Sequence, residues 1–387
     1  MKEEWTSRRR VETALSHQEP DRVPTDLTIT RVPYRRLRAH LGLPAEENIE
    51  SDRFGEVRPG LDVLQALGID MTFVKLRGPA HWTPPKPLIN GISLDEWGVG
   101  RKAITLADGS TLFEVVLSPL SDLQPRQIDL DNYPWPNPSD PGRVSGLETD
   151  ARRLYEQTDL ALMGRFGGTI LEQASFLRGY EQWLMDLVLH PEFARDLMNR
   201  IADIQIALDE AGIRAAGRFL TVFKLSGEDL GMQDRPLFSP DVWHETLRPV
   251  LTRRWAAARS ALDRYGAGHV KLMLHSDGAI RTFIPDLIEA GIDILDPVQV
   301  YCQGMEATEL KTEFGSKLAF HGAIDTQRLL PFATVGEVES EVVRMIKALG
   351  SGGGFILAPV HNVQPDVPPG NIVAVYRAAH EYGRYPL

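Results

Sequence analysis

The sequence has almost no cysteine: Cys302 is the single one among 387 residues. One thiol cannot form an intrachain disulfide, and it excludes a zinc site built from several thiolates. Any metal that this chain holds is therefore bound mainly by nitrogen and oxygen. A single cysteine also fits a reducing cytoplasm, which is the location we expect.

Long apolar runs and an excess of basic residues are missing as well. No segment reaches the roughly 20 apolar residues of a membrane span, and the N-terminus, MKEEWTSRRRVETALSHQEP, lacks the apolar region of a signal peptide. The net charge is −11, from 42 Lys and Arg against 53 Asp and Glu, whereas binding to a phosphate backbone draws on clustered cations. We therefore expect no membrane and no nucleic-acid partner. The oligomeric state stays open, with a homodimer as one alternative.

The sequence does contain a repeated order of short apolar runs, polar loops and helical periodicity. This order predicts an α/β fold, and eight such runs predict a (β/α)8 TIM barrel that forms a single domain over residues 1–387. After the second strand, residues 78–142 are rich in Pro and Trp and predict an inserted β-hairpin or lid region around the turn ADGS. The predicted strands are Val23–Ile29, Ile69–Leu76, Ala161–Gly167, Leu220–Ser226, Val270–His275, Ile294–Val298, Leu318–Gly322 and Gly354–Pro359.

Polar residues follow the ends of most predicted strands, where barrel enzymes place their catalytic groups. Arg165 lies at the end of the third strand, Glu228 and Asp229 follow the fourth, and His321 lies on the seventh. We interpret these four as candidate catalytic residues. The candidate cofactor-binding residues are the polar ones after the sixth and eighth strands, Gln299, Asn362 and Gln364.

The sharpest combination is His275-x-Asp277 after the fifth strand together with His361 after the eighth. Residues two apart on an extended chain point the same way, and in a closed barrel the eighth strand can lean toward the same volume. Two histidines and a carboxylate, with Glu228 as a fourth ligand, are typical of a catalytic divalent metal, zinc first and iron(II) or manganese next. The alternative is that His275 and Asp277 only hydrogen-bond to each other and to neighbouring strand ends.

Five segments of the sequence resemble the uroporphyrinogen decarboxylase superfamily. They look most like its branch of corrinoid-linked methyltransferases. The segments are TSRRRVETALSHQEPDRVPTDL, GEDLGMQDRPLFSPDVWHE, HSDGAIRTFIPDLIEAGIDILDPVQ, LKTEFGSKLAFHGAIDTQRLLP and GGGFILAPVHNVQPDVPPGNIVAVYRAA. The resemblance runs from about Thr6 to the C-terminus, is weakest across the insertion, and implies the barrel independently of the strand count.

The superfamily's zinc methyltransferases carry His-x-Cys after the fifth strand and Cys after the eighth. Motif by motif, His275 falls on the His, and Asp277 and His361 fall on the two Cys. Without thiolates a metal is more electrophilic, which favours release of an oxygen- or nitrogen-bound methyl group. The decarboxylases carry an Arg-rich N-terminal stretch and an Asp at the end of the second strand. This sequence has neither, and its second strand runs through Phe73 and Lys75, which disfavours porphyrinogen decarboxylation.

The resemblance implies a metal-assisted methyltransferase, or demethylase. Such an enzyme moves a methyl group between a small O- or N-methylated compound and cobalamin carried by a partner corrinoid protein, with zinc or another divalent metal as cofactor. One alternative is a metal-independent decarboxylase or lyase that acts on a small acid through Arg165 and a carboxylate such as Asp26 or Glu228. Another is a non-catalytic barrel that binds a corrinoid or tetrapyrrole-like ligand.

Overall fold

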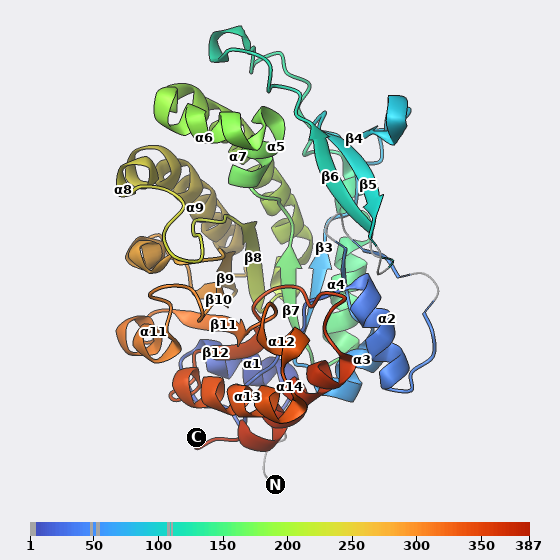
Figure 1. Ribbon diagram of the computed structural model, residues 1–387, viewed down its shortest axis with the longest axis vertical. Coiled ribbons are helices and arrows are strands. Elements are labelled where there is room, and N and C mark those ends of the chain that lie inside the picture. Colours follow the sequence, from blue (N-terminus) through green and yellow to red (C-terminus); the bar gives the residue numbers. More distant parts are fainter. Residues whose placement is uncertain (1–4, 47–48, 52–54, 107–108, 110) are drawn as a thin grey trace.

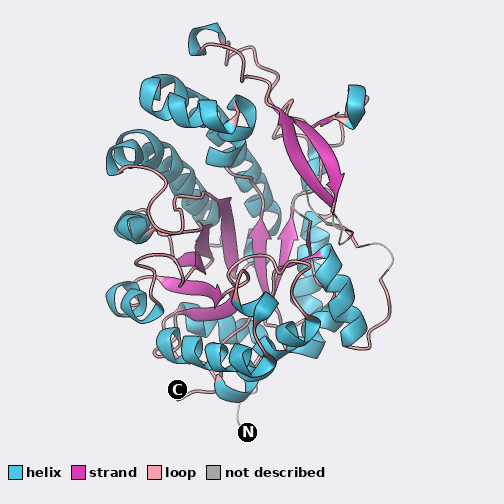
Figure 2. Cartoon of the chain, in the orientation of Figure 1, coloured by secondary structure: helices cyan, strands magenta, loops and turns pink. Residues whose placement is uncertain are grey.

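The computed structural model describes residues 5–46, 49–51, 55–106, 109 and 111–387. Its centre is a curled parallel sheet of seven strands in the order β12, β11, β10, β9, β8, β7, β3 (Figure 1). Helices surround this sheet (Figure 2), which confirms the predicted α/β barrel. The strands are β3 (Met71–Lys75), β7 (Ala161–Arg165), β8 (Val222–Gly227), β9 (Lys271–His275), β10 (Ile294–Val298), β11 (Ala319–Ile324) and β12 (Phe355–Pro359).

The first predicted strand, Val23–Ile29, is mostly irregular chain that joins the two edges of the sheet. On the β12 side, Leu357 N–H donates to Pro24 O at 2.9 Å, and before β3, Asp70 N–H donates to Thr25 O at 3.0 Å. A regular ladder cannot form here because Pro24 has no N–H, and because Thr25 N–H donates to the Asp70 carboxylate at 2.9 Å. The prediction of a regular strand over these residues was therefore wrong. The segment still lies between β12 and β3, in the place of the strand that would close the barrel.

Helices follow most of the strands on the outside of the sheet. Within the described part of the chain, none of them combines the length and apolar character that crossing a bilayer requires. The α-helices are α1 (Ser7–Leu15), α2 (Arg31–His40), α3 (Leu61–Leu67), α4 (Leu147–Gln157), α5 (Leu171–Arg178), α6 (Tyr180–Leu189), α7 (Pro191–Ala216), α8 (Pro240–Val242), α9 (Arg248–Arg264), α10 (Ile284–Glu289), α11 (Ala307–Phe314), α12 (Leu329–Phe332), α13 (Val335–Leu349) and α14 (Pro369–Tyr382).

Two small antiparallel sheets lie outside the barrel. One pairs β1 (Ile29–Thr30) with β2 (Glu56–Val57), and the other, after β3, contains β4 (Ser93–Leu94), β5 (Gly100–Thr105) and β6 (Thr111–Leu117). Figure 1 shows the second sheet beyond the arrowheads of β3 and β7, on the side where the barrel strands end. The ADGS turn predicted at residues 107–110 joins β5 to β6, but residues 107, 108 and 110 lie outside the described residues.

The apolar core has two parts. The larger lies between the sheet and the outer helices. The smaller fills the barrel with inward-facing strand residues and two residues of α1: Val11, Leu15, Met71, Phe73, Ala161, Met163, Val222, Met273, Ile294, Ala319 and Ile356. Helix α1 closes the N-terminal end of the barrel, where Gly354 N–H, just before β12, donates to Ala14 O at 2.7 Å. The C-terminal end of the barrel strands is not covered by this helix, and it is the end at which barrel enzymes place their active sites.

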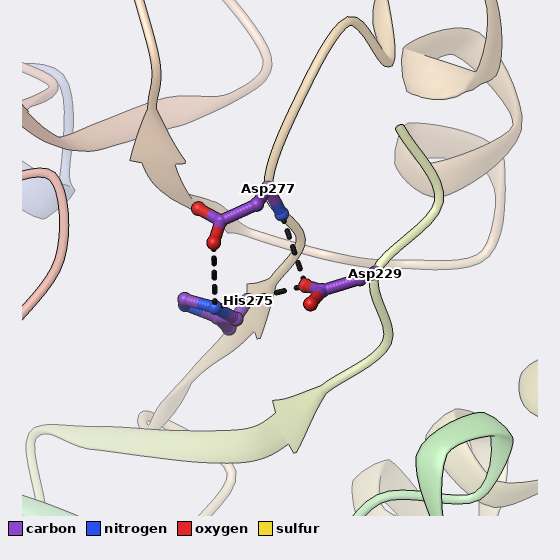
Figure 3. A group of neighbouring side chains, drawn as sticks. All are labelled: Asp229, His275 and Asp277. Atoms are coloured by element: carbon purple, nitrogen blue, oxygen red, sulfur yellow. Dashed lines mark hydrogen bonds and ion pairs between the residues drawn. The ribbon is translucent and has the colours of Figure 1, made fainter. Parts of the chain in front are cut away.

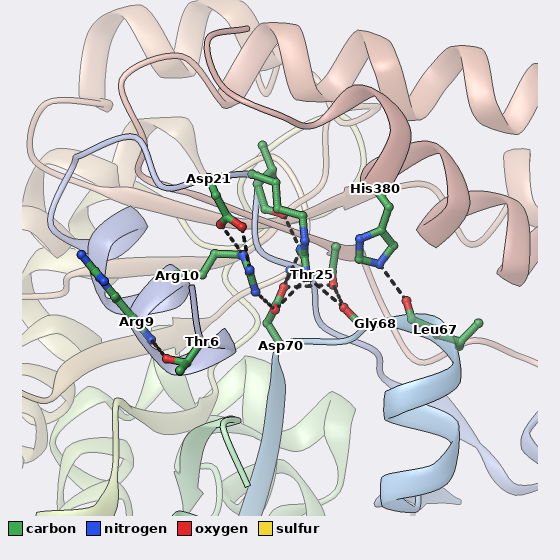
Figure 4. A network of polar contacts seen from close by, with 11 residues as sticks. Thr6, Arg9, Arg10, Asp21, Thr25, Leu67, Gly68, Asp70 and His380 are labelled. Carbon is green, nitrogen blue, oxygen red and sulfur yellow. Dashed lines mark hydrogen bonds and ion pairs between the residues drawn. The ribbon is translucent and has the colours of Figure 1, made fainter. Parts of the chain in front are cut away.

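A buried ion-pair network ties this closed end together (Figure 4). Its centre is Asp70, which is fully buried just before β3. Arg10 Nη1 lies 2.6 Å and Arg22 Nη1 2.7 Å from the two oxygens of Asp70. Asp21 binds Arg10 Nε at 2.6 Å, and Thr25 N–H completes the shell of Asp70. Both carboxylate oxygens of Asp70 are therefore hydrogen-bonded inside the protein.

Candidate active site

The inward-facing side chains change from apolar to charged near the C-terminal ends of the strands. Lys75 on β3 is in register with Arg165 on β7, which is in register with Lys224 on β8. The inward-facing layer below them is apolar and includes Phe73 and Met163. The three cations line a cavity of about 670 Å³, which is the size of a small-molecule site. The site is therefore at the end of the barrel where catalytic groups are found in this fold.

The end of β8 is irregular, and this irregularity sets which residues face the cavity. The register between β8 and β9 shifts between Lys224 and Gly227, and Ser226 has a left-handed φ of 67°. A Cβ on Gly227 would lie 2.8 Å from His275 Cδ2, so only glycine lets the His275 ring lie this close to β8. This bulge changes the direction of the residues that follow it, and the Asp229 side chain lines the cavity.

The loops after β8 and β9 meet backbone to backbone. A Cβ on Gly278 would lie 2.4 Å from the carbonyl carbon of Gly231, and Gly278 has a φ of 93°. Across the same contact, Asp277 N–H donates to Asp229 Oδ1 at 3.2 Å. These contacts hold the two carboxylates on one side of the His275 ring (Figure 3).

Asp229, His275 and Asp277 form a candidate metal centre. One ligand atom of each lies within 4.8 Å of the others. His275 Nε2 lies 3.8 Å from Asp229 Oδ1 and 3.9 Å from Asp277 Oδ2. Ligand atoms at about 2.0–2.2 Å from a tetrahedral zinc ion lie about 3.4 Å apart, so a small movement of these side chains would bring all three atoms onto one divalent ion. Burial and the charge of Asp229 raise the pKa of Asp277 against the effect of His275, a repulsion that a cation would relieve.

Asp296 on β10 orients the histidine of this group. Asp296 Oδ2 lies 3.0 Å from His275 Nδ1 and 2.6 Å from Lys224 Nζ, and its Oδ1 lies 2.7 Å from His321 Nδ1. Burial alone would raise the pKa of Asp296, but Lys224 and the two histidines hold it well below its usual range. An ionised Asp296 accepts a hydrogen bond from the Nδ1–H of His275, which leaves Nε2 toward the two carboxylates.

His321 and Asp26 continue this network into the barrel. His321 is 2% exposed, and its Nε2 lies 3.2 Å from Asp26 Oδ2. Burial alone would lower the pKa of His321, but Asp296 and Asp26 raise it to about 9. His321 is therefore a buried cation at neutral pH and does not line the cavity. Its predicted role in catalysis would have to act through Asp296 and His275.

Glu228 is placed away from the candidate metal centre. It is fully buried, and its two oxygens accept the N–H groups of Ile170 and Leu171, both at 2.8 Å, with Arg254 Nη1 at 3.8 Å. Burial raises the pKa of Glu228 to about 8 against the effect of Arg254 and these N–H groups. Glu228 and Asp229 are neighbours on an extended loop, so their side chains point to opposite sides. The prediction that Glu228 is a metal ligand is therefore corrected: its neighbour Asp229 belongs to the candidate metal centre instead.

The other predicted site residues lie outside the group formed by Asp229, His275 and Asp277. His361, Asn362 and Gln364 line the same cavity, and the His361 ring centroid is 6.3 Å from that of His275, outside the group of three. Arg165 also lines the cavity. Gln299 Oε1 accepts the Gly278 N–H at 2.8 Å and so supports the loop that carries Asp277.

Four site residues were assigned no role from the sequence: Glu56, Lys75, Lys224 and Asp296. Asp296 and Lys224 had a detectable signal, because each is a charged residue inside an otherwise apolar strand. Lys75 ends the second predicted barrel strand and had the same kind of signal. Glu56 comes from β2, outside the barrel strands, and its contact with Arg165 Nη1 at 2.6 Å depends on the tertiary structure.

Comparison with known proteins connects the chain to one family. The model of the family "Uroporphyrinogen decarboxylase (URO-D)" matches residues 119–382. The uroporphyrinogen decarboxylase of Saccharophagus degradans is 27% identical over 197 residues, so the match spans 50% of this chain and about half, 49%, of that protein. The corresponding enzyme of Proteus mirabilis is 23% identical over 66% of this chain and 68% of that protein. A methyltransferase from Methanosarcina mazei has the same fold, with a TM-score of 0.66 at 16% identity over 98% of this chain and 99% of that chain.

Proposed function

We propose that this chain, which belongs to the uroporphyrinogen decarboxylase (URO-D) family, is a metal-assisted methyltransferase. In this proposal it takes a methyl group from a small O- or N-methylated compound and passes it to cobalamin on a corrinoid protein. The end-to-end similarity in fold to a protein described as a methyltransferase supports this reaction class.

One observation carries the proposal: His275 is held at Nδ1 by Asp296, so that Nε2 faces Asp229 and Asp277 at the edge of an open cavity. A carboxylate behind a histidine is the usual arrangement around a catalytic metal, because it fixes the tautomer and makes the ligand more basic. A cavity of about 670 Å³ beside the group leaves room for a substrate. Asp229, His275 and Asp277 would hold the ion.

A divalent ion on nitrogen and oxygen ligands supplies Lewis acidity toward the atom that carries the methyl group. The residues of the chain provide the rest. Asp229 and Asp277 are fixed by the contact between their loops, and Phe73, Phe113 and Phe166 give the cavity apolar surface. In the reaction the bond from methyl carbon to oxygen or nitrogen breaks. The methyl group joins the reduced corrinoid, and the heteroatom keeps the electron pair and takes up a proton.

A second candidate is a decarboxylase or lyase that acts on a small acid without a metal. The curated relatives favour it, because they are named uroporphyrinogen decarboxylases. In this candidate Arg165 would hold the acid. Asp26 is 5% exposed and bonded to His321, so it would act only through the network that it shares with Asp296.

The test combines metal analysis with a methyl-transfer assay on the full chain. We expect close to one divalent ion per chain in protein purified without chelator. We also expect methylcobalamin to form from cob(I)alamin and a methoxylated donor. His275→Ala and Asp277→Asn should lose the ion and lower turnover by about 100-fold or more, which corresponds to several kcal/mol of transition-state stabilisation.

Two further variants sharpen this test. His40→Ala removes an exposed histidine at the end of α2 and should leave both readouts unchanged. His361→Ala tests whether His361 is a fourth ligand. The variant keeps the ion if Asp229, His275 and Asp277 suffice, and it loses the ion if His361 is also a ligand. Metal-free protein with full turnover would contradict the proposal and favour the metal-independent candidate.

A further inference from the structure

We infer that the substrate of this site is a small monoanion, and that its carboxylate binds at Lys75, beside Arg165, on the cavity wall formed by β3 and β7. This inference rests on the proposed function and names the class of compound on which it would act. Its evidence is independent of the metal centre, since it comes from the row of cations Lys75, Arg165 and Lys224.

The three cations lie side by side because their strands are in register. Lys75 pairs with Arg165, and Arg165 pairs with Lys224, at the inward-facing positions directly above the apolar interior of the barrel. All three side chains line the cavity. Neighbouring strands are about 4.8 Å apart, so the row extends roughly 10 Å along the wall from Lys224, whose strand is next to that of His275. A small molecule can thus reach both the metal centre and the far end of the row.

Nearby carboxylates form ion pairs with two of these cations, and the third cation has no such partner among the described residues. Arg165 Nη1 lies 2.6 Å from Glu56 Oε1, and Lys224 Nζ lies 2.6 Å from Asp296 Oδ2. Among the described residues, no carboxylate lies within the 4.0 Å ion-pair distance of Lys75 Nζ. The exposed Lys75 therefore carries the positive charge of the row that remains available to a ligand.

A buried hydroxyl gives a second, independent indication of a polar ligand. Thr169, in the loop after β7, lines the cavity and is only 6% exposed. Its Oγ1 is buried and has no hydrogen-bond partner among the described residues. Buried hydroxyl groups in proteins are nearly always hydrogen-bonded, so this one is available to a ligand atom.

The remaining lining restricts the ligand to one negative charge and a partly apolar body. Glu114 on β6 faces the same cavity, and it would repel a compound with several carboxylates. Phe73, which lies 4.1 Å below the Arg165 guanidinium, and Phe113 provide apolar surface for a ring or a short chain. A methoxylated aromatic acid has these properties.

The experiment measures binding rather than turnover, on the full chain by titration calorimetry without corrinoid. The probes are 4-methoxybenzoate and anisole, which share the ring and the methoxy group and differ in the carboxylate. We expect the acid to bind at least about 10-fold more tightly, as a charge-assisted hydrogen bond implies. Lys75→Met should bring the two affinities together, and Lys75→Arg should keep most of the difference. Lys347→Met, which removes an exposed lysine on α13, should change nothing.

The binding results test the inference about the carboxylate, and the methyl-transfer results test the proposed function. Equal affinities of the wild-type chain for acid and anisole, no binding of either, or an unchanged preference in folded Lys75→Met would overturn the inference. If anisole then still yields methylcobalamin, the proposed function stands without it. A preference for the acid that depends on Lys75, with no methyl transfer from either compound, supports the inference and removes the proposed function.

Discussion

Two buried carboxylates lie near opposite ends of the barrel and have different kinds of partners. Asp70, at the closed end, is held by two guanidinium groups and a backbone N–H, which stay charged or fixed at any ordinary pH. Asp296, near the open end, is held by Lys224 and two histidines, and one of these, His275, faces a cavity. A buried carboxylate can therefore hold chain segments together when its partners are arginines, and can orient reactive groups when its partners are histidines.

The largest expected effect is at the closed end. Asp70→Asn leaves Arg10 and Arg22 without their buried partner, and removing one member of a buried ion pair costs about 3–5 kcal/mol of stability. Denaturant unfolding measures this loss. The folded fraction should still bind the metal with wild-type affinity.

The control for this variant is Glu148→Gln, which breaks exposed ion pairs with Arg152 and Arg218 and should cost far less stability than Asp70→Asn. If Asp70→Asn weakened metal binding while it left the unfolding free energy unchanged, the division of roles between the two ends would be wrong.

The next effect is at the open end. Asp296→Asn removes the charge that orients His275 and should weaken metal binding about 10- to 100-fold, as loss of a carboxylate behind a histidine ligand does. Competition with a chromophoric chelator measures this affinity on folded protein. Asp293→Asn is the matched control, because Asp293 lies just before the same strand and pairs with Arg259 at 2.6 Å, away from His275. Equal affinities of the two variants would show that Asp296 does not position the ligand.

The third effect is a dependence of the unfolding free energy on pH. The pKa of His321 is raised to about 9 in the folded chain, against an ordinary value of 6.5. Its protonated form stabilises the fold fully below about pH 6.5, and this contribution is lost as the pH rises through about 9, by at most about 1.4 kcal/mol per pH unit.

The measurement compares the wild-type chain with His321→Gln. The stability advantage of the wild-type chain should shrink between pH 6.5 and 9.5. His40→Ala should follow the wild-type profile, since His40 is exposed. Parallel profiles for wild type and His321→Gln would show that His321 is not a buried cation.

Much of the barrel was predictable because apolar strands and helical periodicity repeat along the chain. The convergence of His275 with Asp277 followed from their spacing on an extended strand. The choice between Glu228 and Asp229 was not predictable, because it depends on the bulge at Ser226 and on N–H groups of a different loop. Interactions such as that of Lys224 with Asp296 join strands through their register and side-chain geometry, which single-sequence patterns do not specify.

The contact between Gly231 and Gly278 sets the spacing of the two carboxylates without contributing any functional group. Since a methyl group at Gly278 would collide with the facing backbone, a side chain there has to push the loops after β8 and β9 apart. Asp229 and Asp277 would then separate as a pair, even though neither was changed. The distance across the candidate metal centre is thus controlled by two positions with no side chain, and substitutions there would change which ion could fit by size rather than by ligand chemistry.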